Sequence, residues 1–321
     1  MHKTCVISVN YHGASDTAKC VKSLLESRAS VEIVVVDNSP DDPELVKSLD
    51  FAPGVTILRA PRNLGFGSAN NLGINWAMQH STCEFIFLLN NDTVIYEDSI
   101  AILESAMADQ ISVGIMVPRI AYLDRPEVLW YGGGEVDWRR ASAFTPGINR
   151  SADADLALTE RDVTFATGCA LFIRRSALVQ LGGFDPRFFM YEEDLEFCLR
   201  AAARGIGIRY IPRSLILHRV QGSNRSHTGD RSDFWSVTDP KLPFYAYHVI
   251  RNRLLNTYLH ARGWQRGTAL VFFPLFLMRR AIPFILGRRF DAVWAMCRGV
   301  GDSWKARRLR EDVGAPVQLA K

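Results

Sequence analysis

The 321-residue sequence predicts an α/β fold, a Rossmann-like, mixed and mainly parallel sheet flanked by helices, followed by a basic helical tail. Buried-strand patterns alternate with helical patterns along the N-terminal third, which is typical of sheets built from strand–helix–strand units. Several of these strands end in polar clusters, at the edge where open α/β sheets bind ligands. A composition of 48% hydrophobic and 22% charged residues suits a globular protein with a large core.

The predicted strands of the N-terminal third lie at residues 6–9, 33–36, 55–58 and 85–89. Their short connections predict parallel pairing through right-handed crossovers. The polar residues that follow them are Asn10 and Tyr11, then Asp37, then a loop with Asn63 and Gly65, and finally Asn90, Asn91 and Asp92. Their repetition after successive strands marks the ligand-binding edge of a doubly wound sheet.

The strand at residues 85–89 has five apolar residues in a row, a run that is typical of a strand buried on both faces. It stops in Asn90, Asn91 and Asp92. A carboxylate beside two amide oxygens suits a hard divalent cation that carries a diphosphate. Asn and Asp are also ordinary turn formers, so a plain strand-to-turn junction is the alternative.

Several classes of protein are disfavoured by motifs that the sequence lacks. The first strand is followed by Asn-Tyr-His-Gly-Ala-Ser and not by the G-x-G-x-x-G of a dinucleotide oxidoreductase, and no P-loop motif occurs. The six cysteines have no C-x-x-C spacing and are interpreted as reduced thiols of a cytosolic protein. We expect neither a secretory signal nor an apolar run of membrane-spanning length, and no nucleic-acid partner.

The second half of the chain contributes a predicted strand and a predicted helix with candidate residues. Residues 165–173 are predicted to form a strand that is interrupted by a close backbone approach at Gly168, next to Thr167. A helix is expected to begin near residue 191, and it opens with three acids at residues 192–194. Acids in a first turn complement the helix dipole. Three adjacent carboxylates also repel one another, and a carboxylate beside an apolar wall is a candidate general base.

Residues 261–321 form a basic tail, with 12 Lys and Arg against 4 Asp and Glu, whereas the rest of the chain has 26 against 30. Two apolar runs in this tail, at 268–278 and 281–286, are accompanied by arginine pairs, and each is too short to cross a membrane. They predict amphipathic helices that lie on an anionic membrane surface, with a packing or homodimer element as the alternative. The polar segment 219–243 is expected to be a lid over the nucleotide or a linker.

An ordered set of motifs between residues 6 and 256 resembles the rhamnosyltransferase-like branch of the family-2 glycosyltransferases. The motifs are V-N-Y-H-G, V-V-D-N-S, N-L-G-F-G-S-A-N-N-L-G, L-L-N-N-D-T, T-G-C-A-L-F-I-R-R, G-G-F-D-P-R-F-F-M-Y-E-E-D-L-E-F-C-L-R and R-N-R-L-L-N. The resemblance implies a glycosyltransferase-A fold, a nucleotide-sugar donor, Mn²⁺ or Mg²⁺, and inversion at the anomeric carbon. We therefore expect a nucleotide-sugar-binding half at 1–110, an acceptor and catalytic half of the same domain at 111–260, and the basic tail at 261–321.

The resemblance also assigns roles to single residues. The nucleotide-sugar site would contain Asn10, Tyr11, Asp37, Asn63, Gly65, Asn90, Asn91, Thr167, Gly168 and Arg251. Asp92 and His218 would hold the metal. Glu193 and Asp194 match a Glu-Asp pair that is assigned to catalysis, in which Asp194 would be the base that takes a proton from the acceptor.

The expected function is therefore metal-dependent, inverting transfer of a sugar. The donor would be dTDP-L-rhamnose, and the transferred sugar would be rhamnose. The acceptor would be a hydroxyl of a lipid-linked or polysaccharide molecule in cell-envelope glycan synthesis. We expect the protein in the cytoplasm, bound peripherally to the inner face of the cell membrane. The alternative is a catalytically silent nucleotide-sugar or glycan-binding protein on the same fold, which a donor-hydrolysis assay would distinguish.

Overall fold

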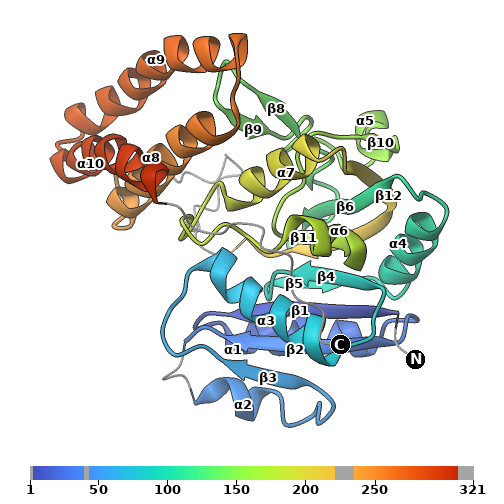
Figure 1. The fold of residues 1–321 in the computed structure, drawn as a ribbon. Coiled ribbons are helices and arrows are strands. Elements are labelled where there is room, and N and C mark those ends of the chain that lie inside the picture. The colour runs from blue at the N-terminus through green and yellow to red at the C-terminus, as the bar shows by residue number, and fades with distance from the viewer. Residues whose placement is uncertain (1–2, 40–42, 221–234, 310–321) are drawn as a thin grey trace.

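The computed structural model describes residues 3–39, 43–220 and 235–309. A ten-stranded sheet with the order β10-β12-β6-β11-β4-β1-β2-β3 crosses the protein, with β5 paired to β12 and β7 to β6 (Figure 1). The segment expected to be a lid or linker, 219–243, includes residues 221–234, which lie outside the described residues.

The N-terminal half of the sheet is parallel. β1 (Thr4–Asn10) lies between β2 (Val31–Asp37) and β4 (Phe85–Leu89), and β3 (Thr56–Arg59) pairs with the other side of β2. The helices of this half are α1 (Ala14–Leu25), α2 (Glu44–Ser48) and α3 (Phe66–His80). All five residues of β4 are buried, as its continuous apolar run predicts.

The second half of the sheet is mixed. β11 (Ala170–Arg174) is antiparallel to both β4 and β6 (Val113–Tyr122), and β12 (Gly207–His218) runs parallel to β6. The further strands are β5 (Thr93–Ile95), β7 (Leu129–Tyr131), β10 (Arg161–Asp162) and the hairpin of β8 (Glu135–Asp137) with β9 (Ser142–Phe144). The helices are α4 (Ser99–Ala108), α5 (Asp155–Leu158), α6 (Arg175–Leu181) and α7 (Glu193–Ala203). One apolar core runs through both halves.

Three C-terminal helices form a separate layer with an apolar core of its own (Figure 1). They are α8 (Leu242–His260), α9 (Trp264–Leu286) and α10 (Phe290–Arg308). Leu254 of α8, Phe284 of α9 and Met296 of α10 are buried in this core. The helical layer therefore begins with α8, ahead of the expected start of the tail at residue 261.

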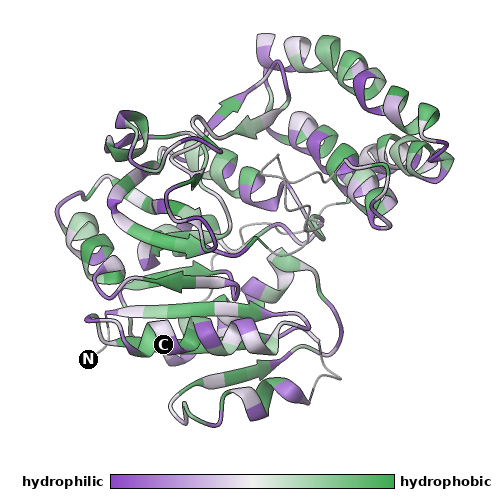
Figure 2. Ribbon diagram, turned by 180° about the vertical axis from the view of Figure 1, so that it is seen from behind, coloured by the Kyte–Doolittle hydropathy of each residue, from purple (hydrophilic) through white to green (hydrophobic). Residues whose placement is uncertain are grey.

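The two apolar runs expected to form separate short helices lie on one continuous 23-residue helix, α9, which contains Pro274 and Pro283. By length and composition this helix is long and apolar enough to cross a membrane, which corrects the expectation that no such segment exists. Only 17% of its most apolar stretch is buried. Figure 2 shows the hydrophobic colouring along much of α9, where Val271 and Leu275 are 69% and 54% exposed.

Candidate functional site

The candidates at the ends of β1 and β2 form one buried, hydrogen-bonded cluster. The sheet register pairs Asn10 with Asp37, and Asn10 Nδ2 donates to Asp37 Oδ1 at 3.3 Å. Ser39 Oγ donates to the same oxygen at 2.9 Å. Tyr11 follows Asn10 and is 53% exposed. The strand ends thus place a fixed carboxylate near an exposed aromatic ring, an arrangement that suits one wall of a nucleotide pocket.

The loop that begins α3 is held to this cluster through Asn38. Asn38 Nδ2 donates to Asn63 Oδ1 at 3.0 Å, and Asn38 Oδ1 accepts from the Leu64 amide at 2.8 Å. Gly65 has a φ of +80°, and a Cβ at this position would lie 2.1 Å from the carbonyl oxygen of Phe189. Because only glycine permits this approach, the loop and the segment before α7 can lie in contact.

The segment after β4 is joined to the same edge of the sheet. Asn91 Nδ2 donates to Thr17 Oγ1 at 2.9 Å, and Thr17 Oγ1 donates to Asn10 Oδ1 at 2.9 Å. The Asn90 amide donates to the Cys169 carbonyl at 2.8 Å. These bonds bring the end of β4 next to the segment that precedes β11, where the other sugar-binding candidates lie.

The two expected metal ligands are brought together by strand pairing. β5 and β12 are antiparallel, and His218 lies opposite Thr93. His218 Nε2 is 3.1 Å from Asp92 Oδ1, and the His218 ring packs edge-on against Trp130 with a centroid distance of 4.5 Å. His218 is only 4% exposed. A carboxylate oxygen and an imidazole nitrogen therefore face each other at the end of the sheet.

This pair of donors fits a divalent ion that binds together with a substrate. Among the residues that the structure describes, no group of three or more His, Cys, Asp or Glu side chains could hold a metal. Two protein donors leave the other positions of the ion to water and phosphate oxygens, which is how Mg²⁺ is often bound. A mixed nitrogen and oxygen set also suits Mn²⁺.

Asp194 accepts two backbone hydrogen bonds at the start of α7. The Gly168 amide donates to Oδ2 at 3.0 Å, and the Leu195 amide donates to Oδ1 at 2.9 Å. Burial raises the pKa of Asp194 to about 6, although the two amide bonds act to lower it. A carboxyl group with this pKa is ionised at neutral pH and still basic enough to accept a proton, as a general base must be.

Glu193 has different surroundings from Asp194. Its side chain is 5% exposed, and its Oε2 has no hydrogen-bond partner in the described part of the chain. Burial, and then the neighbouring charge of Asp194, raise the pKa of Glu193 well above its usual range. Of the expected catalytic pair, Asp194 therefore lines a cavity, whereas Glu193 is buried inside the protein.

The turn before α7 has an uncommon backbone conformation, because Tyr191 and Glu192 have φ values of 67° and 66°. The side chain of Asn252, on α8, spans this turn. Its Nδ2 donates to the carbonyl oxygens of Met190 and Tyr191 at 2.9 and 2.7 Å. Asn256 Nδ2 donates to the Glu192 carbonyl oxygen at 3.0 Å. Helix α8 therefore holds the turn that presents the expected base.

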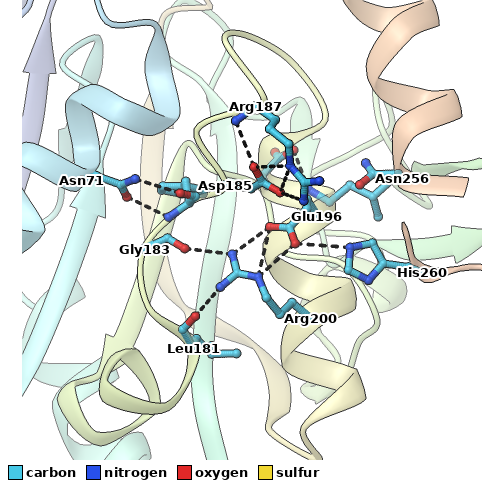
Figure 3. Close-up of polar contacts among 12 residues, drawn as sticks. Asn71, Leu181, Gly183, Asp185, Arg187, Glu196, Arg200, Asn256 and His260 are labelled. Carbon is cyan, nitrogen blue, oxygen red and sulfur yellow. Dashed lines mark hydrogen bonds and ion pairs between the residues drawn. The ribbon is translucent and has the colours of Figure 1, made fainter. Parts of the chain in front are cut away.

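Figure 3 shows ionic contacts that fix the loop before α7 and the helix itself. Asp185 is fully buried and accepts from Arg187 Nε at 2.9 and 3.0 Å. Arg200 Nη2 donates to Glu196 Oε2 at 2.7 Å and to a loop carbonyl at 2.8 Å. Burial opposes the ionisation of Glu196, but hydrogen bonds from His260 and Arg200 outweigh it and lower the pKa of Glu196 to about 2. The loop, α7 and the end of α8 are thus joined by charged groups.

Arg251 does not join the other nucleotide-binding candidates. Its Nη1 donates to the Arg187 carbonyl oxygen at 2.9 Å and to Asn252 Oδ1 at 2.6 Å. Within the described part of the protein, its contacts lie under the turn before α7, and none links it to the cluster of Asn10 and Asp37.

A cavity of about 270 Å³ opens beside Asp194, between the β8–β9 hairpin, the start of α7 and α8. Ser142, Trp235 and Arg253 contribute to its lining and were not expected from the sequence. Arg253 lies within the motif R-N-R-L-L-N, which offered a reason to consider it. Ser142 and Trp235 belong to segments without a motif, so only the folded structure brings them to the site.

Comparison with known proteins supports the family that the motifs indicate. The model of the family described as Glycosyl transferase family 2 matches residues 5–182. The N-acetylglucosaminyl-diphospho-decaprenol L-rhamnosyltransferase of Mycobacterium tuberculosis is 27% identical over 263 residues. This match covers 76% of the chain and 80% of that relative.

Two solved structures share the fold. TarS 1–349 of S. aureus matches with a TM-score of 0.57 and 15% identity, over 95% of this chain and 81% of that one. The mannosyltransferase PcManGT from Pyrobaculum calidifontis, in complex with GDP-Man and Mn²⁺, matches with a TM-score of 0.55 and 14% identity, over 94% and 87%. These likenesses bear on the fold alone and confirm its glycosyltransferase-A type. Since the family model matches more than half of the residues, the chain belongs to glycosyl transferase family 2.

Proposed function

We propose that this protein is an inverting glycosyltransferase that moves a sugar from a nucleotide-sugar donor to an acceptor hydroxyl. The observation that carries the proposal is the position of Asp194. Its carboxylate accepts from the Gly168 amide at 3.0 Å, beside the expected donor site, and it also lines the cavity of about 270 Å³. A carboxylate between two substrate sites is placed to deprotonate one substrate as it attacks the other.

We infer that the donor is dTDP-L-rhamnose and that the acceptor is a lipid-linked sugar in cell-envelope glycan synthesis. The support is the Mycobacterium tuberculosis relative, which is named as an N-acetylglucosaminyl-diphospho-decaprenol L-rhamnosyltransferase. The nucleotide would bind along the cluster of Asn10 and Asp37 and the loop of Gly65. The transferred sugar would lie beside Thr167 and Gly168.

The proposed reaction is a single displacement. The acceptor oxygen attacks the anomeric carbon from the face opposite the diphosphate, and its proton passes to Asp194. The bond between the anomeric carbon and the diphosphate oxygen breaks, and its electron pair stays on the diphosphate. One displacement inverts the anomeric centre and requires no covalent intermediate with the protein.

Asp92 and His218 are the residues that would hold a divalent ion. When bound, such an ion offsets the charge that develops on the leaving diphosphate. The orientation and the basicity of Asp194 are set by the protein itself. The amides of Gly168 and Leu195 orient the base, and the partial burial that raises the pKa of Asp194 keeps it basic.

We also propose that the helical layer lies on the inner face of the cell membrane, with α9 in the plane of the surface. The exposed side of α9 carries Val271 and Leu275, and its other side buries Phe273 and Phe284 in the helical core. A membrane-spanning position would remove these two rings from that core. Arg279 and Arg280 lie within α9, and an arginine at the centre of a bilayer costs at least about 2.5 kcal/mol.

Replacement of Asp194 by Asn is expected to lower transfer by about 100-fold or more, because the amide cannot accept the proton. In the unaltered enzyme, kcat/KM should fall as the pH decreases through about 6, since only the ionised Asp194 is a base. Asp109→Asn, an exposed substitution at the end of α4, is the control and should not change the rate. Equal transfer by both variants, or a rate independent of pH between 5 and 7, would contradict the assignment.

Donor and metal can be tested together by protection against thermal unfolding, because a ligand that binds only the folded state raises its stability. In a screen of nucleotide sugars with Mn²⁺, dTDP-L-rhamnose should raise the unfolding temperature most.

Chelation should abolish transfer, and Mn²⁺ should restore it at least as well as Mg²⁺. His218→Ala should weaken the preference for Mn²⁺. Full transfer in excess chelator would rule out the proposed role of Asp92 and His218.

Membrane binding is tested on the exposed side of α9. The double variant Val271→Glu, Leu275→Glu should bind vesicles that contain anionic lipid about tenfold or more weakly, because it loses the burial of two apolar side chains. Binding of the unaltered protein should weaken at high salt without vanishing. The control is Ile111→Glu, an apolar residue that is 90% exposed after α4. Equal co-sedimentation of the double variant and the control would mean that α9 serves in packing or dimerisation instead.

A further inference from the structure

The cavity beside Asp194 contains a buried polar group that the proposed reaction does not use. Glu192 Oε1 accepts from Arg253 Nη2 at 3.1 Å and from Ser142 Oγ at 3.3 Å. Arg253 Nη2 also donates to Ser142 Oγ at 2.9 Å, so the three side chains form a closed set. The side chains of Glu192 and Arg253 are 10% and 13% exposed. We name these three residues the cavity triad.

We propose that this cavity binds the terminal sugar ring of the acceptor and selects a neutral ring through the cavity triad. The inference rests on the proposed function, because it places the acceptor hydroxyl at Asp194. The three residues of the triad belong to β9, the turn before α7, and α8. Their side chains come into contact only in the folded protein. The proposal therefore adds a recognition role to residues that have no part in donor binding or proton transfer.

The chemistry of the triad suits a ligand with hydroxyl groups. Glu192 Oε2 is buried and has no hydrogen-bond partner among the described residues. An unsatisfied buried carboxylate oxygen is unfavourable, so a ligand donor that reaches it gains affinity. A sugar hydroxyl is such a donor, and the guanidinium of Arg253 can donate to a second sugar oxygen.

The charge and size of the cavity narrow the class of ligand. The carboxylates of Glu192 and Asp194 outnumber the single cation, Arg253, so an acidic sugar would be repelled while a neutral ring is not. The aromatic rings of Phe165 and Trp235 provide apolar walls for the faces of a ring. A volume of about 270 Å³ lies below the usual range of about 300–1,000 Å³ for larger ligands, which favours one ring over an oligosaccharide.

The cavity wall also touches the helix that we place on the membrane. The Arg253 guanidinium lies 4.4 Å from the ring centroid of Phe276 on α9. Trp235 stacks on Phe284 of the same helix with a centroid distance of 6.0 Å. A sugar ring in the cavity is therefore close to the apolar helix, which favours an acceptor carried on a lipid over a free polysaccharide.

The test separates acceptor recognition from donor chemistry. Ala143→Leu fills part of the cavity from β9 and leaves the triad intact. Arg253→Lys keeps the positive charge but replaces the bidentate guanidinium donor by a single ammonium group. Phe144→Leu, on the same strand but outside the cavity lining, is the matched control. The acceptor probes are methyl glycosides of neutral hexoses and N-acetylhexosamines, and the same sugars as polyprenyl diphosphates in vesicles. Donor hydrolysis without acceptor is measured in parallel, and circular dichroism and thermal unfolding confirm that each variant is folded.

We expect Ala143→Leu and Arg253→Lys to raise the KM for acceptor about tenfold or more relative to any change in the KM for donor, with both lipid-free and lipid-linked probes. Phe144→Leu should change neither. An unchanged acceptor KM in a folded Ala143→Leu variant would overturn the proposal, as would a change confined to lipid-linked probes. Donor hydrolysis by the unaltered protein without transfer to any neutral probe would also overturn it. A protein that neither transfers from nor hydrolyses any nucleotide sugar would instead refute the proposed function.

Selection against charge has its own measurement. Glucose and glucuronate differ at one carboxylate, so their inhibition of transfer isolates the effect of the negative charge. Glucuronate should inhibit at least about tenfold more weakly than glucose, and Glu192→Gln should narrow this difference because one of the two repelling carboxylates is removed. Equal inhibition by the two sugars would contradict a neutral-ring site.

Discussion

The geometry of the proposed active site depends on three hydrogen bonds from two buried asparagines of α8 to the turn before α7. Tyr191 and Glu192 both have positive φ values, and such a conformation costs about 1–3 kcal/mol for each non-glycine residue. The bonds from Asn252 and Asn256 to three successive carbonyl oxygens of the turn offset this cost. Without them the turn would relax, and the carboxylate at the start of α7 would point elsewhere.

This constraint changes how the C-terminal helices are understood. They are not an appendage to a complete catalytic domain, since α8 supplies both asparagines and also Arg253 of the cavity triad. Phe188, in the loop before α7, packs with Leu255 of α8 and Ala306 of α10. The helical layer thus connects the apolar surface of α9 with the turn that precedes the proposed base, Asp194. This arrangement would place the proposed acceptor site and the proposed membrane-facing surface in one connected unit.

Much of the fold could be predicted from the sequence, because buried strands and their polar ends are local patterns. The continuous apolar run of β4, and the pairing of Asn10 with Asp37, follow from strand periodicity and parallel pairing. The proximity of Asp92 and His218 was expected from the family resemblance, and the roles of these residues stay predictions. The union of the two apolar runs in one helix, α9, was missed, because the arginine pair between them suggested an interruption that the helix does not have.

The parts that could not be predicted depend on contacts between distant segments. Ser142 and Arg253 are 111 positions apart, and no local sequence pattern predicts that their side chains are in contact. The positive φ values of Tyr191 and Glu192 lack the usual glycine or asparagine, so no turn rule identifies them. Arg251 was assigned to the nucleotide site, but the fold places it under this turn.

Whether α8 holds the turn that orients Asp194 can be measured with Asn252→Ala, with Asn75→Ala on the exposed side of α3 as the control. Both variants should be measured well below their unfolding temperatures, for transfer rate and for the pH at which kcat/KM falls. Asn252→Ala is expected to lose about 1–3 kcal/mol of stability and about tenfold or more in transfer rate, with a displaced pH midpoint, while Asn75→Ala is unchanged. Normal transfer with an unshifted midpoint in a folded Asn252→Ala protein would contradict it.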